Sequence, residues 1–183
     1  MDDPGSMSAG NIIVKLVILL VLILVNAFFA MSELAIISLN DNKIDKMAED
    51  GNKKAKKIVK LTENSSKFLS TIQIGVTLAG FLTSASASTT FASMITDALR
   101  GTVVYNALGE GLINGIAVVI VTIIMSYFSL VLGELVPKKI AMQVPEKISF
   151  KIVDILLLFS KLFAPLVKIL SVSTNAVVRL LGF

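Results

Sequence analysis

The chain of 183 residues is 55% hydrophobic with a mean hydropathy of +0.84, which is too apolar for an ordinary soluble domain of its size. It contains neither cysteine nor histidine, which excludes disulfides, thiolate or imidazole metal sites, and catalysis by Ser-His or Cys-His pairs. A metal ion bound here must therefore be held by oxygen. The formal net charge of +4, beside long apolar runs, indicates lysines gathered on one side of a membrane, so we expect membrane lipid and no nucleic acid as a partner.

Three long apolar runs predict three transmembrane helices, because each is long enough to cross the roughly 30 Å hydrocarbon layer. They lie at about 12–39, 68–96 and 112–134. The second run has no charged residue but many serines, threonines and glycines, which let helices approach closely and supply hydroxyl oxygens. The sequence therefore predicts an all-α membrane protein with three transmembrane helices.

The segment at 40–67 alternates lysines with apolar residues at helical spacing, which predicts a helical hairpin parted at Gly51 and Asn52. A dedicated binding patch is the alternative to a plain connection. Most lysines and arginines lie in this segment or follow Lys138, whereas the N-terminus and the expected external loop at 97–111 hold few. The positive-inside rule then predicts an N-terminus outside, and a hairpin and C-terminus in the cytoplasm.

The last segment, 145–183, is apolar but interrupted by charges. Lys151, Asp154 and Lys161 recur at intervals that keep charge on one helical face. We therefore expect a juxtamembrane amphipathic belt helix at the inner leaflet, bent at Pro165. The alternative is a fourth span, which would bury Asp154 and Lys161 in lipid.

The third run ends in the motif that carries the chemistry. Glu134 costs on the order of 2.5 to 3.5 kcal/mol at the bilayer centre and less near its edge, so it needs a partner or a water-filled cavity. Gly133 permits close helix approach, and Pro137 lacks the N–H that would pair with the carbonyl of Gly133. One carboxylate with hydroxyl and carbonyl oxygens is a hard ligand set suited to Mg²⁺ or Ca²⁺. An ion pair between Glu134 and Lys138 is the alternative.

Further oxygen donors are expected from every span. The candidate metal ligands beside Glu134 and Gly133 are Ser32, Ser70, Thr77 and Ser126. Structural or gating roles are assigned to Pro137, Gly80, Gln73 and Glu33. Pairing with a lysine explains Glu33 equally well. Because Glu33 and Glu134 are the only conceivable catalytic carboxylate pair, we expect no enzyme.

Three ordered motifs, at 28–33, 73–80 and 133–138, resemble the transmembrane (DUF21) domain of the CorC/cyclin-M (CNNM) family of magnesium transporters. The resemblance covers about residue 10 to the C-terminus. It implies a three-span homodimer in the inner (plasma) membrane, and a largely dehydrated Mg²⁺ bound by serine, glutamate and backbone oxygens. It also implies Na⁺-coupled export of Mg²⁺, so that Mg²⁺ is the transported substrate and Na⁺ the coupling ion.

By this resemblance Glu134 matches the family's ligand glutamate, Gly133 and Pro137 its flanking pair, and Ser32 falls in its first-helix serine motif. The chain departs from the pattern in the first two motifs. Some members carry serine where Ala30 stands, and others carry asparagine at the end of the second motif, where this chain has glycine.

The family normally continues into cytoplasmic nucleotide-binding CBS domains, which would be partners of this domain. Because this chain stops without them, we interpret 10–183 as a single transmembrane domain. Residues 1–9 read as a cloning remnant with a disordered N-terminus. The alternative to a transporter is a non-transporting membrane anchor that senses divalent cations for cytoplasmic domains.

Overall fold

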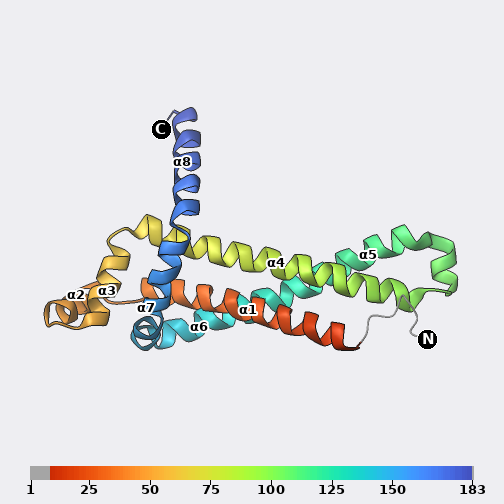
Figure 1. Cartoon of the computed structure of the whole chain (residues 1–183), viewed down its shortest axis with the longest axis horizontal. Helices are drawn as coiled ribbons and strands as arrows, with labels where there is room; N and C mark the ends of the chain where they lie inside the picture. The colour runs from red at the N-terminus through yellow and green to blue at the C-terminus, as the bar shows by residue number, and fades with distance from the viewer. Residues whose placement is uncertain (1–8, 183) are drawn as a thin grey trace. The chain divides into compact units, whose positions relative to one another are not determined.

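The computed structural model describes residues 9–182, and Figure 1 shows the elements in chain order. They are α1 (Ala9–Ile37), α2 (Asp41–Glu49), α3 (Lys53–Thr62), α4 (Ser65–Leu99), α5 (Val103–Leu130), the π-helix η1 (Val131–Leu135), α6 (Val136–Gln143), α7 (Pro145–Leu162) and α8 (Ala164–Leu180). No strand occurs among the described residues, which confirms the all-α class. The segment read as a cloning remnant lies outside them, apart from Ala9.

Three helical segments are long and apolar enough to cross a membrane: Gly10–Ile37, Ser65–Leu99 and Val103–Gln143. The three predicted spans are thus confirmed, and the chain is a multi-pass membrane protein. The third segment continues through η1 and α6. Its backbone N–H and C=O groups stay hydrogen-bonded within the helix, which tolerates the local widening of a π-turn. Large apolar side chains on these helices are exposed, as expected of surfaces that face lipid.

The external loop predicted at 97–111 is shorter than expected, since only residues 100–102 lie outside helices. The side chain of Thr102 accepts a hydrogen bond from the backbone N–H of Tyr105 at 3.3 Å and so caps the next helix. Helical geometry is interrupted at Gly109, where φ is 77°, a value that favours glycine. The polar composition of this stretch therefore marks a capped helix start rather than a loop.

The described residues form two compact units. We call residues 9–27 with 78–135 the span unit, and residues 28–77 with 136–182 the hairpin unit.

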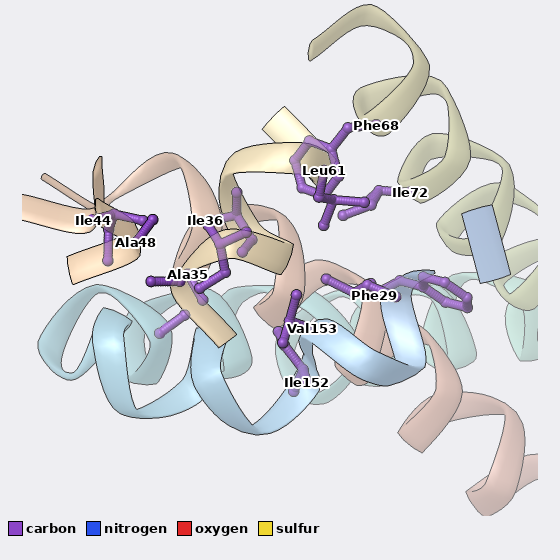
Figure 2. Packing of buried hydrophobic residues seen from close by; sticks show 14 residues of the cluster. Phe29, Ala35, Ile36, Ile44, Ala48, Leu61, Phe68, Ile72, Ile152 and Val153 are labelled. Atoms are coloured by element: carbon purple, nitrogen blue, oxygen red, sulfur yellow. The ribbon is translucent and has the colours of Figure 1, made fainter. Parts of the chain in front are cut away.

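The hairpin unit is built around one hydrophobic cluster (Figure 2). The cluster draws side chains from α1, α2, α3, α4, α6 and α7: Phe29, Ala35, Ile36, Ile44, Ala48, Ala55, Ile58, Leu61, Phe68, Ile72, Ala141, Ile152, Val153 and Leu156. Since α3 and α7 each bury one apolar face here, their charged residues are left on the outside. The segment at 40–67 is thus a helical hairpin with one face packed on the cluster and one solvated face.

The two hairpin helices part where the sequence predicted. Gly51 adopts a φ of +93° between them, a conformation that strains other residues. The side chain of Asn52 then accepts hydrogen bonds from the backbone N–H groups of Lys54 and Ala55 and caps α3.

The belt segment is bent, as predicted. Helices α7 and α8 meet at an angle of 64° across a short break, and Pro165 lies in the first turn of α8, where its missing N–H costs nothing. Ion pairs join α7 to the hairpin, between Lys43 and Glu146 and between Lys57 and Asp154. Together α7 and α8 are also long and apolar enough to form one broken span.

Candidate functional site

Glu134 lies in the π-helix η1, in the last part of the span unit. Its position follows from Pro137, which cannot donate the hydrogen bond that an α-helix would give to the carbonyl of Gly133. The ladder is interrupted there, and the helix widens to a π-turn before it resumes as α6. Such turns are rare and occur frequently at functional sites. Glu134 is half-buried.

Gly133 lies directly against α1 within the span unit. A Cβ atom built on Gly133 would lie 2.9 Å from Nδ2 of Asn26 and 3.5 Å from the carbonyl oxygen of Ile23. The first of these distances is too short for a real side chain, so only glycine allows α1 to approach the π-turn this closely. The sequence predicted that helices approach closely at Gly133, and these distances give the geometric reason.

Asn26 is the unexpected member of this contact. It is 4% exposed, and its Oδ1 atom finds no hydrogen-bond donor among the described residues. An unsatisfied buried acceptor costs on the order of 1 to 3 kcal/mol and calls for an explanation such as a bound ion or water. Sequence reasoning placed Asn26 inside the first span but gave it no role. The available signal was a lone amide in an otherwise apolar run.

The other predicted residues of the span unit take no part in this contact. Ser126 is exposed on α5. Gly80 is half-buried, and a Cβ built on it would meet no atom within 4 Å. Close packing therefore does not require glycine at this position, in contrast to Gly133.

In the hairpin unit, Ser32 is fully buried and its Oγ atom donates a hydrogen bond to the carbonyl of Phe28 at 2.6 Å. The lone pairs of this hydroxyl are not used by that bond and could face a cation. The next residue, Glu33, forms an ion pair with Lys138 at 3.4 Å, and both side chains are only about a quarter exposed. Pro137 is buried beside Lys138. Pairing with a lysine, one of the two interpretations of Glu33, is thus seen.

Residues of the second motif also lie in the hairpin unit. Gln73 donates a weak hydrogen bond to Oγ1 of Thr77 at 3.4 Å, and Thr77 and Ser70 are half-buried. Gly75 serves packing, because a Cβ built on it would lie 2.6 Å from the ring of Phe29. This contact locks the start of α4 against α1 and was not foreseen from the sequence.

A second group of carboxylates lies at the turn between α4 and α5 but is already neutralised. Arg100 forms ion pairs with Asp97 and Glu110, each at 3.3 Å. The charge of Asp97 is the main cause that raises the pKa of Arg100, and Glu110 adds to it. Tyr105 donates a further hydrogen bond to Glu110 at 2.9 Å. These exposed carboxylates already have their partners.

The described residues contain no group of three or more histidine, cysteine, aspartate or glutamate side chains that could hold a metal ion. A cation would therefore be bound by one carboxylate together with neutral oxygens from hydroxyl, amide and carbonyl groups. Mg²⁺ accepts such a set, since it commonly uses only one or two protein carboxylates.

Comparison with known proteins identifies the family of the chain. A family model described as "Cyclin M transmembrane N-terminal domain" matches residues 17–183. A UPF0053 protein of Synechocystis is 38% identical over 96% of this chain, YugS of Bacillus subtilis 29% over 94%, and the inner membrane protein YfjD of Escherichia coli 30% over 86%. The aligned regions span 38%, 39% and 33% of those proteins. The chain belongs to the cyclin M (CNNM, DUF21) family of membrane domains.

Proposed function

We propose that the chain is the membrane domain of a Mg²⁺ transporter and binds a largely dehydrated Mg²⁺ between its transmembrane helices. One observation carries this proposal: the π-turn that holds Glu134 packs through Gly133 onto a buried amide whose oxygen has no hydrogen-bond partner within residues 9–182. Family membership alone fits a role in divalent-cation transport or sensing. The geometry adds a place where a cation would relieve an energetic cost.

In this proposal Glu134 supplies the negative charge, while the carbonyl of Gly133 and Oδ1 of Asn26 supply neutral oxygens from the span unit. Ser126 would be a further donor from the same unit, while Ser32, Thr77 and Ser70 remain candidate ligands predicted from the sequence. A hard cation prefers such oxygens. A single carboxylate also keeps binding weak enough for release, which transport requires.

Transport further requires that the site open to each side in turn. We propose that the π-turn is the element that changes, because a π-turn and an α-turn differ by one residue in their hydrogen bonding. A bound cation would favour the conformation that aims Glu134 and the Gly133 carbonyl at it, and its loss would favour the other. Na⁺ entering in exchange would couple the Na⁺ gradient to Mg²⁺ export.

We further propose a plasma-membrane location with the hairpin unit at the cytoplasmic side, because its lysines follow the positive-inside rule. The N-terminus would then lie outside. A homodimer that carries cytoplasmic CBS domains, and no enzymatic activity, complete the proposal.

The ion pair between Glu33 and Lys138 favours a second candidate, a sensor. It ties α1 to α6 directly after the π-turn. A cation that altered the π-turn would act on the start of α6, where Lys138 holds this ion pair, and the domain could report the cation without transport.

Substitution of Glu134 tests the proposed site. In Glu134→Ala and Glu134→Gln, the Mg²⁺-induced rise in melting temperature of the purified protein should disappear, because the only charged ligand is gone. At Mg²⁺ concentrations 100 times the Kd, binding stabilises the wild type by about 2.7 kcal/mol. The matched control Glu110→Gln removes an exposed carboxylate and should keep the full rise. An undiminished rise in both Glu134 variants would refute its role.

Substitution of Asn26 distinguishes a ligand from a structural amide. Asn26→Leu replaces the unpaired acceptor with an apolar group of similar size, so stability in Mg²⁺-free buffer should be unchanged or increased. The Mg²⁺-induced rise in melting temperature should nevertheless shrink. In the control Asn114→Leu, whose amide oxygen accepts a hydrogen bond from Thr96, the rise should persist. If Asn26→Leu instead destabilises the Mg²⁺-free protein and leaves the rise intact, Asn26 has a structural role only.

The close approach of α1 to the π-turn is tested with a pair of glycines. Gly133→Ala should destabilise the protein by about 1 to 3 kcal/mol, because its Cβ overlaps the amide of Asn26. Gly115→Ala on α5 meets no atom within 4 Å and should be neutral or stabilising by up to about 1 kcal/mol. Denaturation in detergent measures both variants, and equal effects would contradict the described packing.

A further inference from the structure

The hairpin unit contains a cavity of about 270 Å³ lined by three lysines, Lys60, Lys67 and Lys161, together with Asn64 and Ser160. We call it the lysine pocket. The lysines come from three different elements: the last turn of α3, the first turn of α4 and the end of α7. Their convergence is therefore a product of the fold and not of a charged run in the sequence.

The N-terminal end of α4 forms one side of the lysine pocket. The side chain of Asn64 accepts a hydrogen bond from the backbone N–H of Lys67 at 2.9 Å, so it acts as the cap of this helix. The remaining N–H groups of the first turn give the helix start a partial positive charge. This charge adds to that of the lysines.

The lysines of the pocket are exposed and, like several other lysines of the hairpin unit, are not paired with a carboxylate within residues 9–182; they differ in that three of them converge on one cavity. Lys43, Lys57 and Lys138 are each paired with a carboxylate. Among the described residues, none of the three pocket lysines has a carboxylate oxygen within 4.0 Å. The nearby Glu63 is exposed and does not line the cavity. Because these lysines are exposed, their mutual repulsion is weakened by solvent, and an anion among them would remove what remains of it.

The rest of the lining is apolar. Leu61 and Phe68 are buried members of the hydrophobic cluster, and Leu157 is half-buried beside them. A free phosphate ion would satisfy the lysines but not this surface. A phospholipid offers both parts, a phosphodiester for the ammonium groups and an acyl chain for the apolar wall. The pocket also lies at the start of Ser65–Leu99, a helix long and apolar enough to cross a membrane, so we expect it near the lipid head groups.

We propose that the lysine pocket binds the phosphate head group of an anionic phospholipid, with the start of an acyl chain against Leu157, the partly exposed residue of the apolar wall. The lipid would neutralise the three lysines and join α3, α4 and α7 through one ligand. This inference does not depend on the proposed transport of Mg²⁺.

The test compares lipid binding by two charge-matched triple variants in nanodiscs. The pocket variant is Lys60→Gln/Lys67→Gln/Lys161→Gln. The control variant, Lys53→Gln/Lys56→Gln/Lys151→Gln, removes the same charge from exposed positions of α3 and α7 outside the pocket. Native mass spectrometry counts retained phosphatidylglycerol against phosphatidylcholine at equal mole fractions.

The wild type and the control should retain phosphatidylglycerol preferentially. The pocket variant should lose at least fivefold of this preference, since one lysine near an anionic surface contributes about that factor. An equal loss in both variants would show attraction by bulk charge and overturn the proposal. So would inorganic phosphate that stabilises the wild type in detergent as strongly as phosphatidylglycerol, because the occupant would then be a soluble anion. If the pocket variant does not fold, the single substitution Lys161→Glu against Lys151→Glu gives the same comparison.

Discussion

The central constraint in this protein is a polar group that a membrane-spanning helix buries without a partner. Asn26 would be costly at its depth unless something satisfies its oxygen. The neighbouring helix has the smallest residue, Gly133, at the point of contact with Asn26, and it forms a π-turn at the same place. Pro137 makes that turn possible because it gives up a backbone donor. Glycine, proline and carboxylate thus lie within one turn and a half of the helix that packs on the buried amide, and Gly133 is the residue that contacts it.

The hairpin unit illustrates a different balance. Its stability comes from apolar side chains of six helices in one cluster, whereas the ion pairs on its surface are exposed and each contributes about 0 to 1 kcal/mol. The charges therefore matter less for stability than for what the unit can bind. A lysine that lies opposite a carboxylate of α7 is neutralised by it. The three lysines of the lysine pocket have no carboxylate partner among the described residues and are available to a ligand from the membrane.

Much of the fold could be predicted from the sequence. Uncharged runs indicate helices that face lipid, and charges on one side of a helix indicate a position at the membrane interface. The parts that failed depend on single contacts. The connection at 97–111 reads as a loop by composition, but the Thr102 cap makes most of it helical. The partner of Glu33 lies about a hundred residues away, so spacing could not find it. The sequence shows Asn26 as an amide in an apolar run. That its Oδ1 atom has no hydrogen-bond donor among the described residues can be recognised only in the folded structure, where α1 lies beside Gly133.

The most direct test is Mg²⁺ flux driven by a Na⁺ gradient in proteoliposomes, comparing wild type, Glu134→Gln and Glu110→Gln at equal reconstituted amounts. The account predicts that wild type and Glu110→Gln export Mg²⁺ and that Glu134→Gln does not. Equal flux through Glu134→Gln would contradict the assignment of the site. If the wild type binds Mg²⁺ but moves none under any gradient, the transporter proposal is wrong and the domain is a sensor.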